Sequence, residues 1–268
     1  MRASPSMTTD AELDWARRKA EALLLSYGIQ SADEIVVEAI AYDQNAIVRR
    51  EIMSDCEARL TRYPDHATIT VDVSHGIEGR IRFSIAHELG HWILHPHLDQ
   101  PLWQSSKEEI HGYRGSQFER EANAFASELL LPGFLLREPA KKFAFEFPVV
   151  DRIAEKFCAS ATATALALSR HSKEQCVVVL SDGEHVLWSV RNPRLSDWDF
   201  RIEKGAKLRD ETKAWQCPCE GDEKMTKVAN TLDWFPNCKE PHRFEVFEAS
   251  RDIPEFGVVL SLLAVNSY

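Results

Sequence analysis

The pentapeptide His87-Glu-Leu-Gly-His91 constrains this chain more than any other part of its sequence. On an α-helix, residues four apart lie one turn above each other, so the two histidine side chains project from the same face. Two neutral imidazoles at that separation can reach one zinc ion at normal Zn–N distances. Glu88 lies on the same turn, too constrained to bind the ion but placed to hold a water molecule on it. The pentapeptide therefore predicts zinc-assisted hydrolysis, most often of a peptide bond.

The residues around the pentapeptide favour a metal site over an ordinary surface helix. Apolar side chains surround it and predict a largely buried helix: Phe83, Ile85, Ala86, Leu89, Trp92, Ile93 and Leu94. Two imidazoles and a carboxylate inside such a helix are costly unless a partner satisfies them. Gly90 disfavours a helix by about 1 kcal/mol relative to Ala. A glycine here suits a position where another backbone approaches closely.

Neither of the next two histidines suits the third position of a zinc site. His95 continues the one-turn series, but three histidines in a straight helical row cannot converge tetrahedrally on one ion. His97 stands where the metzincin pattern has its third histidine, yet that pattern needs a glycine at the position of Leu94. We therefore expect both to be exposed histidines at a helix terminus. An acidic residue on a second helix is the remaining choice, as in His-His-Glu sites.

The segment 117–132 predicts that second helix. Its apolar side chains recur on one face at helical spacing: Phe118, Ala122, Phe125 and Leu129. Glu121 precedes Phe125 by one turn and borders this apolar face, whereas Glu119 lies at the opposite edge of the face. This geometry favours Glu121 as the third ligand and leaves Glu119 as its competitor.

Two blocks of sequence carry a family resemblance. The first runs from Arg82 to His95, and the second, Glu-Ala-Asn-Ala-Phe-Ala-Ser-Glu-Leu-Leu-Leu-Pro, runs from Glu121 to Pro132. In this order and spacing they resemble the ImmA/IrrE family of bacterial and phage metallopeptidases, over about residues 30–171.

The resemblance implies a gluzincin-like site. In that site His87, His91 and Glu121 would bind zinc, and Glu88 would be the catalytic base. It also implies a partner, since characterised members cleave, or trigger the loss of, helix-turn-helix repressors of stress, mobile-element or defence genes.

The composition predicts an intracellular protein. The chain has 268 residues, 44% of them hydrophobic, which is enough for more than one domain. Residues 1–10 show no basic stretch leading into an apolar core, so no secretory signal is visible. No apolar run reaches the length of a membrane span. Six cysteines in such a chain favour reduced thiols or metal ligands. We therefore expect a cytoplasmic protein that does not enter a membrane.

The pattern of elements predicts an α+β fold in four parts. The parts are a disordered tail (1–10), a zincin-like metallopeptidase domain (11–148), a helix-turn-helix-like helical pair (149–171) and a β-rich C-terminal sensing or regulatory domain (172–268). Within the peptidase domain, helices should accompany a small mixed sheet with strands at 46–52, 57–63 and 67–73.

The helical pair at 149–171 is predicted to be structural, and a DNA-binding regulator that uses this pair is the less favoured alternative. A DNA-reading helix needs Arg, Lys, Asn or Gln near its start. Here Ser160 caps a helix that begins with Ala161 and has no basic residue before Arg170. The formal net charge of −10 also disfavours a dedicated nucleic-acid binder.

Four residues in the C-terminal region offer the ligand types of a second, structural zinc site: Cys217, Cys219, Cys238 and His242. The Cys-x-Cys spacing is less typical than Cys-x-x-Cys, so free thiols on a loop are the alternative. A further hypothesis is that one of these thiols occupies the open position of the catalytic zinc until a signal removes it.

The expected function is that of a zinc endopeptidase that cleaves a helix-turn-helix repressor. Glu88 would accept a proton from the zinc-bound water and deliver it to the leaving amine. Tyr113 and His111, on the connection between the two helices, are candidates for a second oxyanion donor. The alternative is a non-catalytic regulator that keeps the zinc fold and sequesters a repressor by contact. Glu88 favours the enzyme, because a pure binding module has no need of a base there.

Overall fold

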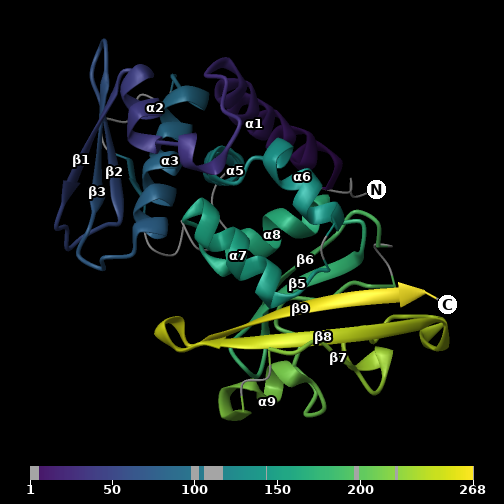
Figure 1. Cartoon of the computed structure of the whole chain (residues 1–268). Helices are drawn as coiled ribbons and strands as arrows, with labels where there is room; N and C mark the ends of the chain where they lie inside the picture. The colour runs from purple at the N-terminus through teal and green to yellow at the C-terminus, as the bar shows by residue number, and fades with distance from the viewer. Residues whose placement is uncertain are drawn as a thin grey trace, which may run out of the picture. The chain divides into compact units, whose positions relative to one another are not determined.

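The computed structural model describes residues 6–97, 103–105, 117–142, 144–195, 199–220 and 223–267 of the chain. Its mixed α+β architecture, shown in Figure 1, confirms the predicted fold class. The chain forms two compact units. The first comprises Met1–Leu135 with Lys156–Ser160, and the second comprises Leu136–Glu155 with Ala161–Tyr268.

The first unit contains a four-stranded sheet in the order β1-β3-β2-β4. Its strands are β1 (Ala46–Glu51), β2 (Ala58–Arg62), β3 (Ala67–Asp72) and β4 (Trp103–Ser105). β1 runs parallel to β3, and β2 runs antiparallel to both β3 and β4. The buried Ile69 of β3 lies in register between Val48 of β1 and Leu60 of β2. The small mixed sheet expected from the sequence is thereby confirmed.

Helices pack beside this sheet. They are α1 (Ser6–Ser26), α2 (Val37–Asp43), α3 (Glu78–Leu94) and α5 (Gln117–Leu130), with a 3-10 turn at Ala32–Glu34. α3 packs against the sheet and α5, and α5 also packs against α1 (Figure 1). α1 begins at Ser6 and so includes residues 6–10 of the expected tail. The polar residues that extend α1 carry no apolar period by which a helix could be recognised.

α3 and α5 approach each other closely at Gly90. A Cβ atom at Gly90 would lie 3.2 Å from Cδ1 of Phe125 and 3.3 Å from both Cα and O of Ala122. Any side chain at this position would press against the backbone of α5. The close backbone approach expected at Gly90 is thus confirmed, and it brings the histidine face of α3 near the side chains of α5.

The second unit contains a five-stranded antiparallel sheet in the order β6-β5-β9-β8-β7. Its strands are β5 (Gln175–Ser181), β6 (Val186–Arg191), β7 (Thr226–Lys227), β8 (Phe244–Ile253) and β9 (Val258–Ser267). On β5, Val177 and Val179 join an apolar core with Trp234 and Phe235. The C-terminal region is therefore rich in strands, as predicted.

Four helices belong wholly or mainly to this unit: α6 (Gly133–Lys142), α7 (Phe147–Phe157), α8 (Ala161–His171) and α9 (Lys213–Glu220). α8 packs on β5, whereas α9 packs on β8 and β9, so helices cover both faces of the sheet (Figure 1). Thr164, Ala165 and Leu168 of α8 are buried. α7 and α8 form the helical pair expected at 149–171.

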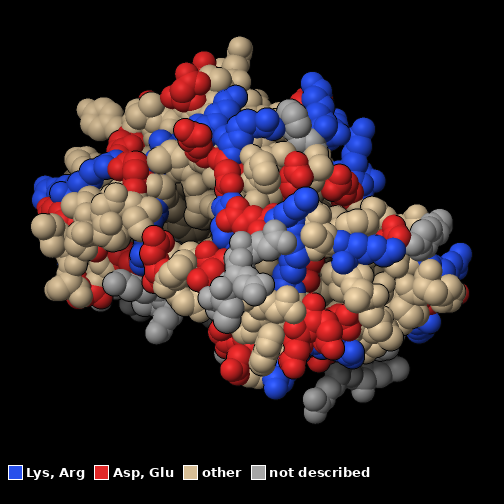
Figure 2. All heavy atoms as spheres, turned by 60° about the horizontal axis from the view of Figure 1, so that its bottom comes forward, with Lys and Arg blue, Asp and Glu red and all other residues tan. Residues whose placement is uncertain are grey.

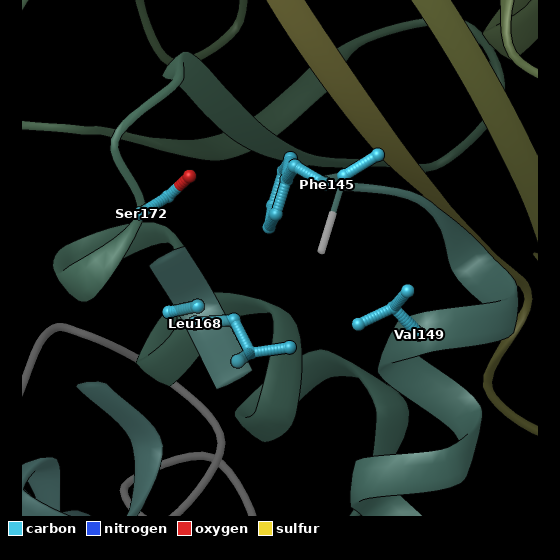
Figure 3. A pocket seen from close by; sticks show the side chains of 6 residues that line it. Phe145, Val149, Leu168 and Ser172 are labelled. Atoms are coloured by element: carbon cyan, nitrogen blue, oxygen red, sulfur yellow. The ribbon is translucent and has the colours of Figure 1, made fainter. Parts of the chain in front are cut away.

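A small hollow lies among the helices of the second unit. Phe145, Val149, Leu168 and Ser172 line it, as Figure 3 shows. Its volume of about 10 Å³ is close to the space that one water molecule needs. The hollow is therefore too small to be a substrate site.

The surface carries both signs of charge. On the face drawn in Figure 2, acidic and basic side chains are interspersed and do not gather into one basic patch. Within the described parts of the chain, no helix combines the length and apolar character that a bilayer crossing requires.

Candidate metal centre

Two histidines of α3 and one glutamate of α5 meet inside the first unit. The Nε2 atoms of His87 and His91 lie 3.1 Å apart. Each also lies 3.1 Å from a carboxylate oxygen of Glu119. All three side chains are buried. They form the cluster of potential metal ligands found among the described residues.

The spacing of these atoms suits a zinc ion. A tetrahedral ion with ligand bonds of about 2.0–2.1 Å holds its ligand atoms about 3.3 Å apart. The separation of 3.1 Å between the two nitrogens is close to that value, and so are the distances of 3.1 Å from His87 to Oε2 and from His91 to Oε1 of Glu119. Two imidazole nitrogens and one carboxylate are also the donor set of His-His-Glu zinc sites, which keep a fourth position for water or substrate. The residues present therefore fit one catalytic zinc ion.

The third member of this cluster differs from the residue expected from the sequence. Glu121 accepts hydrogen bonds from His95 Nε2 at 2.8 Å and from Gln117 Nε2 at 2.9 Å. The structure therefore brings Glu119, the competitor named in the sequence analysis, against the histidine pair, and it does not bring Glu121 there. Two residues along a helix correspond to a rotation of about 200°, so the two carboxylates leave α5 in different directions.

Asn123 is a site residue that the sequence analysis missed. Its Oδ1 lies 3.0 Å from His87 Nδ1 and accepts the hydrogen bond of that ring nitrogen. Such a partner fixes the tautomer of a metal-binding histidine and leaves Nε2 free to bind the ion. Asn123 lies one turn beyond Glu119 on the same face of α5. An acidic residue followed four positions later by Asn is the signal that could have identified both residues.

His95 and His97 have different environments. His95 ends α3 and is only 6% exposed, because it packs edge-on against the ring of Phe118 at a centroid distance of 5.0 Å. The expectation of an exposed histidine was wrong there, whereas His97 is exposed as expected. The sequence analysis missed the carboxylate that satisfies the buried His95 ring.

Glu88 is completely buried on α3, directly after His87. The nearby cation Arg62 donates a hydrogen bond of 2.6 Å from Nη2 to the carbonyl oxygen of His91 and lies over the ring of Trp92. Burial lowers the pKa of Arg62, and the charge of Glu88 opposes this effect. Tyr113 and His111, the expected oxyanion donors, lie outside the described residues.

Burial and charge set the protonation of the ligands. Burial lowers the pKa of His91 to about 4, so this ring is neutral at neutral pH, as a zinc ligand must be. Burial also acts against ionised Glu119, but the adjacent rings of His87 and His91 hold the pKa of its carboxyl well below its usual range. For His87, burial is outweighed by the hydrogen bond to Glu119 and the charge of Glu88, which raise its pKa. Because zinc binds only the neutral imidazole, this raised pKa of His87 makes protons stronger competitors of the metal at acidic pH.

The residues expected at a second zinc site do not form a described cluster. Cys238 is buried in the apolar core of the second unit, where burial raises the pKa of its thiol. His242 is exposed. Cys217 and Cys219 lie in α9, and their side chains are outside the described part of the structure.

Comparison with known proteins places the metal centre in a family. Residues 46–169 match the model of the IrrE N-terminal-like domain, a peptidase family. No curated protein matches the chain. A solved structure of a Mycobacterium tuberculosis transcriptional regulator matches with a TM-score of 0.62 and 15% sequence identity, over 93% of this chain and 76% of the regulator. At this identity the likeness shows a shared fold. Residues 46–169 of this chain are therefore similar to IrrE N-terminal-like domains, in agreement with the resemblance of its sequence motifs.

Proposed function

We propose that this protein is a zinc-dependent endopeptidase of the cytoplasm that cleaves a helix-turn-helix repressor. The observation that carries the peptidase assignment is the triangle of ligand atoms from His87, His91 and Glu119, with the buried Glu88 beside it. A binding module would need neither ligand atoms at zinc spacing nor a carboxylate in the position of a base.

Each residue of the centre has a part in the proposed chemistry. His87, His91 and Glu119 would hold the ion, which when bound supplies Lewis-acid activation of a water molecule. The carboxylate of Glu88 accepts the proton of the attacking water and delivers it to the leaving amine. The surrounding burial excludes bulk water, which strengthens the electrostatic interactions of the site.

The proposed substrate rests on similarity. The sequence motifs resemble those of ImmA/IrrE peptidases, whose characterised members act on helix-turn-helix repressors. The solved structure with a similar fold is itself a transcriptional regulator. Both observations support a role in the control of transcription, exercised on a repressor protein.

The decisive test is a cleavage assay with the Glu88→Gln variant. The substrate is a helix-turn-helix protein encoded beside this chain, incubated with and without a chelator. We expect wild type to produce fragments only when zinc is loaded, and Glu88→Gln to keep its zinc while cleavage falls by about 10²- to 10⁴-fold. Glu78→Gln is the matched control, because Glu78 lies in the first turn of the same helix and pairs with Arg50.

Three results would contradict the proposal. Undiminished cleavage by Glu88→Gln would remove the base from the mechanism. Cleavage that survives complete chelation would remove the metal. Release of repression by Glu88→Gln without any fragment would instead establish sequestration of the repressor by contact.

A further inference from the structure

We propose that His95 and Glu121 are positioning residues that fix the ring of His91 toward the metal. Together with Gln117 they form a chain of hydrogen bonds that ends at the face of His91 opposite the ion. The inference rests on the proposed zinc site, and it assigns to Glu121 a role other than that of ligand.

The chain of contacts is continuous. Gln117 Nε2 donates to Glu121 Oε1 at 2.9 Å, and Glu121 Oε2 lies 2.8 Å from His95 Nε2. His95 Nδ1 in turn lies 3.2 Å from His91 Nδ1. The other nitrogen of His91, Nε2, is the atom that faces His87 and Glu119. Four side chains from two helices thus connect α5 to the metal-binding atom of His91.

The proton positions follow from the carboxylate. An ionised Glu121 can only accept, so the proton on its partner must sit on His95 Nε2. In a neutral imidazole the second nitrogen is then an acceptor, and His95 Nδ1 has to receive a hydrogen from His91 Nδ1. This leaves the lone pair of His91 on Nε2, where a zinc ligand needs it. Glu121 therefore determines the tautomer of His91 through one intervening ring.

The surroundings hold the chain in place. His95 is 6% exposed and Glu121 is 5% exposed, so water does not compete strongly for their hydrogen bonds. The ring of Phe118 packs edge-on against His95 and restricts its rotation. Removal of either His95 or Glu121 therefore leaves a buried polar group of its neighbour unsatisfied.

The two histidine ligands are supported in parallel ways. His87 Nδ1 donates to Asn123, a residue of α5, while His91 Nδ1 donates to His95. Loss of such outer partners typically weakens metal binding by about 10- to 100-fold. Asn123 therefore gives an internal standard against which the effect of His95 can be compared.

Zinc affinity of the full-length chain is the first measurement. The protein is stripped with a chelator and titrated with zinc against a competing chromophoric chelator. We expect His95→Leu and Glu121→Ala to weaken zinc binding by about 10- to 100-fold. His95→Asn, whose amide oxygen can accept from His91 Nδ1, should recover most of the affinity lost in His95→Leu. Glu121→Gln keeps an acceptor for His95 and should stay close to wild type.

Glu119→Gln is the matched control for ligand loss, and it should weaken zinc binding far more than Glu121→Gln. Cobalt substitution supplies a second readout, because its visible absorption spectrum should change in His95→Leu and be restored in His95→Asn. The thermal unfolding of the zinc-stripped variants should resemble that of the stripped wild type, which separates positioning from folding.

Equal zinc affinity in wild type and His95→Leu would overturn the proposal. So would a Glu121→Gln variant that loses zinc as severely as Glu119→Gln, since Glu121 would then be a ligand. Either result leaves the peptidase proposal intact, because that proposal is decided by repressor cleavage in wild type and Glu88→Gln.

Discussion

Gly90 determines how closely the two metal-binding helices pack. It faces Ala122 and Phe125 of α5, and a Cβ atom there would approach the Cα and O atoms of Ala122 to 3.3 Å. Backbone atoms cannot rotate away as a flexible side chain can. α3 and α5 can therefore pack at this separation only because Gly90 has no side chain. The same separation allows Glu119 to reach the two histidines.

We predict that Gly90→Ala destabilises the protein and weakens zinc binding. Overpacking of a tight interface typically costs about 1–3 kcal/mol. The intrinsic helix preference of Ala over Gly would act in the opposite direction, by about 1 kcal/mol. Chemical denaturation of the zinc-stripped variant measures the balance, and a gain in stability would show that the interface is looser than the structure indicates.

His87, Glu88 and His91 could be predicted from the sequence because their relation is local. Four residues along a helix return a side chain to the same face, whatever the rest of the fold does. The choice between Glu119 and Glu121 could not be made in this way, because it depends on the rotation of α5 against α3. The apolar face that favoured Glu121 includes Phe118, which packs on His95 and not on the ligand pair.

At the scale of elements, a buried ion pair connects the start of β2 to the metal-binding helix. Glu57 directly precedes β2 and is 1% exposed, and it accepts hydrogen bonds from Arg80 in the first turn of α3. A second pairing of Arg50 on β1 with Glu38 and Glu78 is more exposed. The first pair therefore contributes more than the second to holding α3 on the sheet.

We predict that Arg80→Met lowers the free energy of unfolding by about 3–5 kcal/mol, because it removes the cation that pairs with the buried carboxylate of Glu57. Arg50→Met serves as the comparison and should cost at most about 1 kcal/mol, since solvent screens the exposed pairs. Urea denaturation of both variants without zinc provides the measurement. A similar loss in the two variants would contradict the ranking.

Most elements could be located from the sequence, but their partners could not. The strands β1, β2 and β3 and the helices α3 and α5 have clear apolar periods, so pattern alone indicated them. The pairing of β1 with β3 in parallel is a matter of tertiary structure, and β4 is too short to have a period. The first residues of α1 are polar and have no apolar period, so the sequence pattern did not indicate that this helix begins at Ser6.

At the scale of the whole molecule, the metal centre belongs to the first unit alone. A ligand that binds only the folded state stabilises it by about 2.7 kcal/mol when present at one hundred times its dissociation constant. We predict that zinc slows hydrogen exchange of the amides of α3 and α5, whereas the amides of β5, β8 and β9 exchange at the same rate with or without zinc. Mass spectrometry of the exchanging protein measures both sets in one experiment, and equal protection throughout would show that the two units unfold together.

The sequence indicated a helical region followed by a strand-rich region. It did not indicate which segments of the chain belong to each of the two compact units. α7 and α8 carry the pattern of a helical pair, and that pair is present. α8 packs on β5, where Cys176 Sγ lies 3.9 Å from the carbonyl oxygen of Ser169. A pattern of local spacings does not predict which strand a helix packs on.

The position of three functional side chains on one helix has a practical consequence. α5 supplies all three: Glu119 contacts both His87 and His91. Asn123 contacts His87, and Glu121 contacts His95. A slide of α5 by a single turn would break all of these contacts together. Damage to the packing of this helix should therefore abolish the centre in one step, whatever the distance of the altered residue from the ion.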